Sequence, residues 1–140
     1  MKRTHLLADK RHYNMIRLPI SDLSVAHAVL LTADEPFFAI IFDQHEITIV
    51  APIETWAYIA ERSPNAVREQ GSFRLITFDV VLPPTLIGYM ARISAALAQA
   101  QVPIFPFAAY SRDHIIVAAD KFQAAWDALT ALIDSSSAES

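Results

Sequence analysis

The sequence predicts an α+β fold of two ferredoxin-like units in tandem, each with helices on one face of a mainly antiparallel sheet. Two observations lead to this fold class. The order strand, helix, strand, strand, helix occurs twice along the 140-residue chain. A Val-Ala pair followed by a Trp-bearing helix also occurs twice, at Val50-Ala51 and Val117-Ala118, so the spacing is 117 − 50 = 67 residues. This repeat indicates a duplicated unit rather than two unrelated domains.

The first unit is placed at residues 1–68. Its strands are expected at 13–18, 37–42 and 46–50, and its helices at 24–31 and 54–62. Ser24 can cap the first of these helices, because a serine side chain accepts a hydrogen bond from a free N–H of the first turn. The polar segment Asp43-Gln44-His45 separates two β-favouring runs, which predicts a hairpin.

The second unit is placed at residues 69–133. Its strands are expected at 73–78, 104–110 and 114–117, and its helices at 86–101 and 122–133. A ferredoxin-like unit needs a fourth strand, and the stretch 4–7 within residues 1–12 is a candidate to close the sheet of the second unit. Residues 134–140 have almost nothing to bury and are expected to form a disordered tail.

Composition excludes several classes of function. With only two glycines, Gly71 and Gly88, the chain has no glycine-rich loop for a nucleotide phosphate. The absence of cysteine excludes thiolate metal sites and cysteine nucleophiles. Eleven Lys and Arg against fifteen Asp and Glu give a net charge of −4, and no basic-aromatic octamer typical of RNA-binding sheets occurs, so no nucleic-acid partner is expected.

No membrane or targeting segment is predicted. The apolar group after the basic start is only Leu6-Leu7-Ala8, and the other apolar runs are far shorter than the ~20 residues of a membrane helix. A cytoplasmic protein is therefore expected.

Catalytic and metal sites are not predicted either. His5, Asp9 and His12 would share a face only in a helix, whereas the segment has the pattern of a strand and turn. The Gly-x-Ser-x-Gly signature is absent, and neighbouring Asp113 and His114 would point to opposite faces of a strand. We therefore expect no catalytic residue, no metal ligand and no cofactor.

The entry to the long helix of the second unit is the candidate binding site. Thr85 can cap this helix, and free N–H groups at a helix start suit a carboxylate. Gly88 would admit a ligand to the backbone, or else would allow close packing of helix on sheet. Asp113 could hold an ammonium group, or else could cap its own turn.

The segment from Ala100 to Val117 resembles, without a gap, the pattern of the ACT domain family. Thr85-Leu86-Ile87-Gly88 lies where that family has its helix-starting glycine. The likeness covers about residues 5–132 and is most specific in the second unit. Three features depart from the family pattern: Gln101 replaces a glycine, Pro106 interrupts a strand, and Ala108-Ala109 replace two hydroxyl side chains.

The resemblance implies a non-catalytic regulatory protein that binds a small effector, in particular a free amino acid. The implied contacts are the backbone of Ile87, Gly88 and Tyr89, the charge of Asp113, and the side chain of Tyr110 beside it. A ligand-free interaction module is the alternative. Strands that are apolar on nearly every residue, such as 37–42, also predict a homodimer, because such strands need cover.

Overall fold

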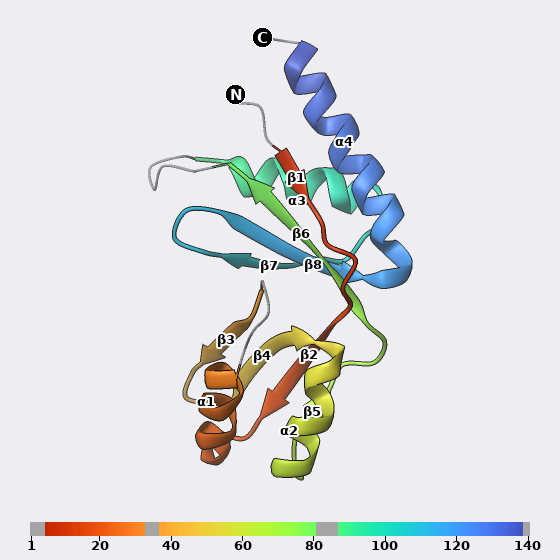
Figure 1. Cartoon of the computed structure of the whole chain (residues 1–140). Helices are drawn as coiled ribbons and strands as arrows, with labels where there is room; N and C mark the ends of the chain where they lie inside the picture. The colour runs from red at the N-terminus through yellow and green to blue at the C-terminus, as the bar shows by residue number, and fades with distance from the viewer. Residues whose placement is uncertain (1–4, 33–36, 81–86, 139–140) are drawn as a thin grey trace. The chain divides into compact units, whose positions relative to one another are not determined.

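The described part of the chain comprises residues 5–32, 37–80 and 87–138 of a computed structural model. Two compact units are present: the first unit is residues 11–73, and the second unit combines residues 1–10 with residues 74–140 (Figure 1). The boundary lies after Phe73 rather than after residue 68, because Phe73 pairs with Tyr13 at the start of the first unit's central strand.

The first unit is a four-stranded antiparallel sheet with two helices. Its elements are β2 (Tyr13–Leu18), α1 (Leu23–Thr32), β3 (Ala39–Phe42), β4 (Ile47–Pro52), α2 (Trp56–Arg62) and β5 (Val67–Arg68). The strand order is β3-β4-β2-β5, with Leu18 opposite Ile47 and Ile16 opposite Arg68. This is the order of a ferredoxin-like sheet, in which the first and third strands are central.

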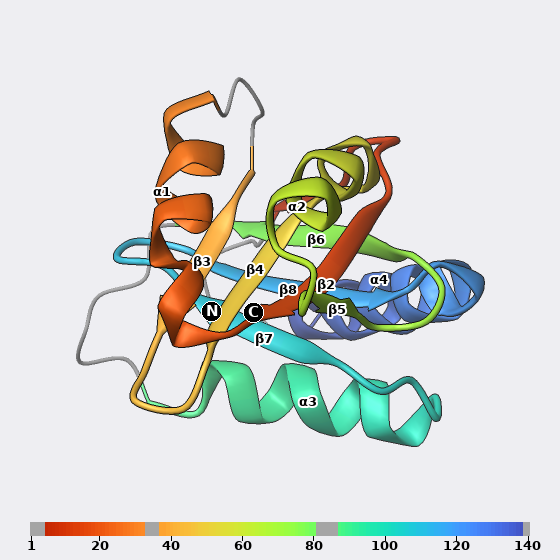
Figure 2. The same cartoon turned by 90° about the horizontal axis from the view of Figure 1, so that it is seen from below.

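The predicted hairpin is confirmed as β3 and β4 (Figure 2). The carboxylate of Asp43 closes its turn by accepting hydrogen bonds from the backbone N–H groups of His45 and Glu46, at 2.7 and 3.0 Å. These hydrogen bonds favour the charged carboxylate, so they lower the pKa of Asp43 below its ordinary value. The local chemistry of one residue thus sets the register of the two strands.

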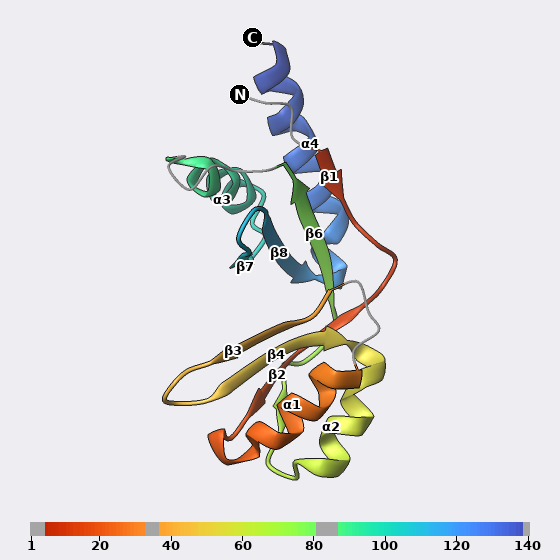
Figure 3. The same ribbon diagram turned by 60° about the vertical axis from the view of Figure 1, so that its left-hand side comes forward.

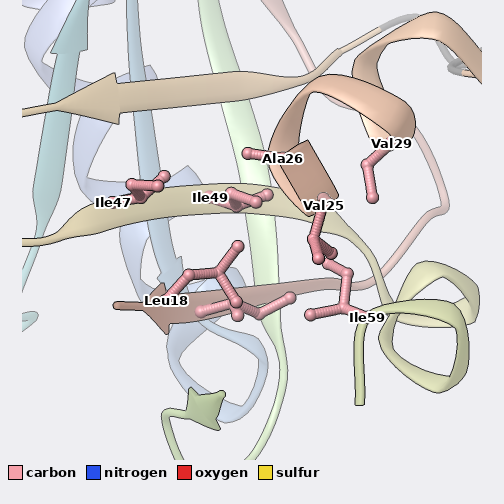
Figure 4. Packing of buried hydrophobic residues seen from close by; sticks show 9 residues of the cluster. Leu18, Val25, Ala26, Val29, Ile47, Ile49 and Ile59 are labelled. Carbon is pink, nitrogen blue, oxygen red and sulfur yellow. The ribbon is translucent and has the colours of Figure 1, made fainter. Parts of the chain in front are cut away.

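Both helices of the first unit lie on one face of its sheet (Figure 3). Apolar residues at every second position of β2 and β4 face them, and Val25, Ala26 and Val29 of α1 complete the core with Ile59 of α2 (Figure 4). A 3₁₀ turn, Ile20–Asp22, leads into α1, so the helix begins at Leu23. Ser24 therefore lies inside the helix, and the expectation that it caps the helix is wrong.

The second unit repeats this architecture. Its elements are β1 (His5–Leu7), β6 (Phe73–Asp79), α3 (Tyr89–Gln99), β7 (Phe105–Ala108), β8 (Asp113–Ala118) and α4 (Phe122–Ala138). The strand order is β1-β6-β8-β7. The fourth strand comes from the start of the chain, since His5 lies opposite Asp79 and Leu7 opposite Thr77. The predicted fold class of two ferredoxin-like units is confirmed.

The core of the second unit lies between its sheet and its helices. Buried side chains of the sheet (Ile76, Phe78, Ile115, Val117) meet Ile93 and Leu97 of α3 and Ala125 and Leu129 of α4. The guanidinium of Arg74 lies over the Phe122 ring at 4.0 Å, which anchors the start of α4 on β6. The Val-Ala pairs lie in β4 and β8, the third strand of each unit, but they are one residue out of step, because Ala51 faces the first core and Val117 faces the second.

Two of the helix boundaries that differ from the sequence expectations have a clear local cause. Helix α3 begins at Tyr89 rather than residue 86, because Gly88 precedes it with φ of 84°. Helix α4 continues to Ala138, so a disordered tail from residue 134 is wrong up to that point. The Ser135 hydroxyl donates to the Leu132 carbonyl at 2.9 Å, and no glycine or proline interrupts the segment.

Candidate ligand-binding site

The candidate site lies at one end of the second unit's sheet. β6 ends there at Asp79, its neighbour β8 begins there at Asp113, and α3 begins after the connection that follows β6. Three elements that are distant in sequence therefore converge on this end. Tyr89, the first residue of α3, is fixed by an edge-to-face contact with Phe78, with ring centroids 6.1 Å apart.

Gly88 sets the direction in which α3 starts. It occupies the N-cap position with φ of 84°, and its carbonyl accepts the first helical hydrogen bond from the Arg92 N–H at 3.2 Å. A Cβ at this position would meet no atom within 4 Å, so close packing of helix on sheet does not explain the glycine. The positive φ does, because side chains other than glycine are strained there.

Asp113 begins β8 on the side of the sheet that faces the helices, because Ile115 and Val117 at alternate positions belong to the core. It lies opposite Ala108 of β7. Burial raises the pKa of the Asp113 carboxyl above its ordinary value, and the charge of His114 partly opposes this rise. A partly desolvated carboxylate of this kind gains from a cationic partner.

His114 lies on the opposite face of the sheet, as alternation requires. Its Nδ1 is 2.8 Å from the Thr77 hydroxyl on β6. Burial lowers the pKa of the His114 imidazole, opposed by the Asp113 charge and assisted by that of Arg112. His114 is thus engaged with β6 and does not pair with Asp113 as a catalytic base would.

An ion pair that the sequence did not predict holds the same end of the sheet. Arg112 Nε donates to Asp79 Oδ1 at 2.7 Å, which connects the start of β8 to the end of β6. In the turn before it, the Ala109 N–H donates to the Arg112 carbonyl at 2.9 Å. The pair joins residues 33 positions apart, so only the strand register brings them together.

The other predicted site residues lie at the surface. Ile87 and Tyr110 are 94% and 96% exposed, so in this structure neither packs onto Asp113. Thr85 lies outside the described residues. The structure therefore brings the start of α3 and Asp113 to one end of the sheet and leaves Tyr110 extended into solvent.

An open apolar pocket in the same unit is a further feature that the sequence did not predict. It lies between α3 and α4 over the end of β6 and is lined by Phe78, Tyr89, Arg92, Ile93, Leu129, Leu132 and Ile133. Its apolar residues have helical spacing, which by itself indicates only a core.

The described part of the chain contains neither a metal-binding cluster nor a membrane-spanning helix. Over residues 5–32, 37–80 and 87–138, no cluster of three His, Cys, Asp or Glu is arranged to hold a metal ion. Within the same ranges, no helix combines the length and apolar character needed to cross a bilayer.

The family model described as "ACT domain" matches residues 70–131, a range that contains β6, α3, β7, β8 and most of α4. No curated protein matches the sequence. Solved structures with the same fold extend over nearly the whole chain. A protein from Agrobacterium tumefaciens is 19% identical, with a TM-score of 0.71, covering 94% of this chain and 90% of that chain.

Two further solved structures share this fold over nearly the whole chain. A protein of unknown function from Vibrio cholerae, described as a possible transport protein, is 22% identical, with a TM-score of 0.68, covering 94% of this chain and 91% of that one. The ligand-free regulatory subunit of aspartate kinase from Thermus thermophilus is 13% identical, with a TM-score of 0.68 and coverages of 92% and 97%. At these identities the likeness concerns the fold. Residues 70–131, which form most of the ferredoxin-like second unit, therefore match the ACT domain family.

Proposed function

We propose that this chain is a non-catalytic regulatory protein that senses a free amino acid through its second unit. The ligand's carboxylate binds the backbone at Ile87, Gly88 and Tyr89, its ammonium binds Asp113, and Tyr110 closes over the side chain. The observation that carries the proposal is Asp113, a partly buried carboxylate with a raised pKa at the end of the sheet where α3 starts. Among the described residues, no side chain forms an ion pair with it.

The start of α3 and the carboxylate of Asp113 together suit a zwitterion, which has both charges, better than a simple anion. The start of α3 carries partial positive charge, which attracts a carboxylate. Asp113 would repel a simple anion but forms a charge-assisted hydrogen bond with an ammonium group. A ligand that prefers one conformation or assembly state of the protein would then shift the equilibrium toward that state, which is how binding becomes regulation.

Calorimetric titration with each of the twenty amino acids tests the proposal. We expect at least one to bind, and we expect Asp113→Asn to weaken it about ten- to a hundredfold, since one charge-assisted hydrogen bond is lost. Affinity for the unmodified protein should also fall as the pH is lowered through the pKa of Asp113, because the protonated carboxyl no longer attracts an ammonium.

Asp120→Asn is the matched control, because Asp120 is an exposed carboxylate in the 3₁₀ turn before α4. It should leave the affinity unchanged. Equal binding by the Asp113→Asn variant would place the site elsewhere. If no amino acid binds at millimolar concentration, the alternative of a ligand-free interaction module is favoured, in agreement with the loss of two hydroxyl donors at Ala108-Ala109.

We also propose that the chain forms a homodimer through the outer edge of β3. Sheet edges are normally protected by charge, by proline or by short length. Each of the other three edge strands has one of these protections: β1 has three residues, β5 has two, and β7 carries Pro106. β3 (Ala39–Phe42) has four apolar residues and neither charge nor proline.

The surface beside β3 is apolar as well. Ile41 and Phe42 are 46% and 53% exposed, and the outer side of α1 exposes Leu23, Leu30 and Leu31. An uncharged strand can pair with its own copy antiparallel about a twofold axis without bringing like charges together. A second copy of the chain therefore provides hydrogen-bond partners for the backbone of the β3 edge and covers these apolar side chains.

A further inference from the structure

The hydrogen bonds of the β3–β4 hairpin determine which backbone groups of β3 point outward. The Asp43 N–H donates to the Glu46 carbonyl at 3.2 Å, so these two residues form a hydrogen-bonded pair at the turn. Such pairs alternate along antiparallel strands, so the backbone of Ile41 also bonds to β4, whereas the backbones of Ile40 and Phe42 do not. The N–H and C=O groups of Ile40 and Phe42 therefore point away from β4.

Within the described part of the chain, β3 has a neighbouring strand on one side only, because it ends the strand order. Its outward backbone groups are thus available to a strand of another chain. Apolar side chains accompany them: Ile41 and Phe42 are 46% and 53% exposed, while Ile40 packs against the core of the first unit. A partner for this edge must supply both backbone hydrogen bonds and apolar side chains.

We propose that two copies of β3 pair antiparallel about a twofold axis at Ile41, so that Ile41 lies opposite Ile41 of the second copy. This inference rests on the proposed homodimer and specifies its register. Ile40 then lies opposite Phe42 of the second copy, and these two residues exchange both backbone hydrogen bonds. In this register the outward groups of the two strands are all paired with one another.

Shifted registers leave part of the β3 edge unpaired. A twofold axis at Ile40 sets Phe42 against Phe38, which lies outside the strand. An axis at Phe42 sets Ile40 against Gln44, which lies beyond the end of the strand. The register at Ile41 keeps every pair within β3 and joins an aromatic to a β-branched side chain twice, a combination that stabilises sheets.

Single cysteines test the register, because the chain has no cysteine of its own. Opposite residues of a non-hydrogen-bonded pair have Cα atoms about 4.5 Å apart, within the range that a disulfide spans. In oxidised glutathione, Ile41→Cys should form a disulfide dimer about tenfold faster than Ile40→Cys or Phe42→Cys. In those two variants the cysteines of the two copies are diagonal neighbours about 7–8 Å apart, too far for a disulfide without backbone movement.

Val67→Cys is the matched control, because Val67 is 49% exposed on β5, the other edge of the same unit's sheet. It measures disulfide formation by random collision and should be as slow as the two neighbouring variants. Sedimentation of each reduced variant verifies that the dimer is retained. On the unmodified protein, NMR of mixed labelled and unlabelled chains should show the Hα of Ile41 in contact with the Hα of Ile41 in the second copy.

The results separate the register from the dimer itself. A folded monomer of the unmodified protein at about ten micromolar overturns both. A dimer in which Ile40→Cys or Phe42→Cys forms the disulfide fastest retains the β3 edge and overturns the register. A dimer without fast disulfide formation at any of the three positions, and without the Hα contact, places the interface elsewhere and overturns the inference.

Discussion

Gln101 adopts a left-handed backbone, with φ of 60°, directly after α3. The Gln101 N–H donates to the Ala98 carbonyl and the Val102 N–H to the Leu97 carbonyl, which is the Schellman arrangement that ends many helices. Val102 and Leu97 are both buried in the core, as this arrangement favours. The position after such a helix usually holds glycine, and glycine is also what the family pattern has there.

Gln101→Gly should therefore stabilise the protein, by about 1 kcal/mol, because a side chain in the left-handed region costs about that much. Urea unfolding monitored by circular dichroism measures the change. Gln99→Gly is the contrasting variant, since Gln99 is the last residue of α3, where glycine should destabilise by up to about 1 kcal/mol. A loss of stability in Gln101→Gly would contradict the proposed strain.

At the scale of residues, the sequence identifies side chains that shape their own adjacent backbone. It does not identify contacts that depend on strand register. Gly88 and Asp43 could be identified because each acts on its own neighbours. The Arg112–Asp79 pair and the pocket under Arg92 could not, because both depend on how β6, β8 and the helices are placed. Tyr110 was expected beside Asp113 on the family pattern, yet the structure exposes it.

Among elements, the β3 edge carries the clearest prediction. Ile41→Lys places a charge on a side chain that is 46% exposed on the unprotected edge strand, and charges on edges oppose pairing. We expect the unmodified protein to sediment as a dimer at about ten micromolar and this variant to shift toward monomer.

Val67→Lys is a close control for that change. Val67 is 49% exposed and lies on β5, the two-residue edge strand on the other side of the same sheet. It should leave the dimer intact. A folded monomer of the unmodified protein would contradict dimerisation itself, and equal dissociation by both variants would contradict the choice of β3.

The prediction of whole elements succeeded where apolar residues alternate and failed where an element is too short to have a period. β2, β4 and β6 place large apolar residues on alternate positions facing the helices, and such runs are recognisable without a structure. β5 consists of Val67 and Arg68 alone, and its pairing with β2 could not be predicted from two residues. The start of α3 depended on the backbone of Gly88 rather than on apolar spacing.

For the molecule as a whole, the main feature is that β1, at the start of the chain, completes the sheet of the second unit. Leu6 packs against the core of that unit, whereas Leu7, on the other face, is 50% exposed. Leu6→Asp should destabilise the second unit by about 2 kcal/mol or more, because a carboxylate is brought to an apolar core, and Leu7→Asp should have little effect.

Hydrogen exchange localises the change. In Leu6→Asp, amides of β6 and β8 should lose protection while those of β2 and β4 in the first unit retain it. Equal loss in both units would show that they unfold together. Unchanged stability would show that β1 contributes nothing to the core.

The strand that pairs with β6 is separated from it by the complete first unit. In topological terms, residues 11–73 are an insertion between the last and first strands of a single ferredoxin-like sheet. During synthesis the first unit emerges in full while β1 has no sheet to join, and it must stay unpaired until β6 leaves the ribosome. A permuted chain with residues 5–10 moved behind α4 would remove this delay, and it would turn the two interleaved units into two consecutive ones.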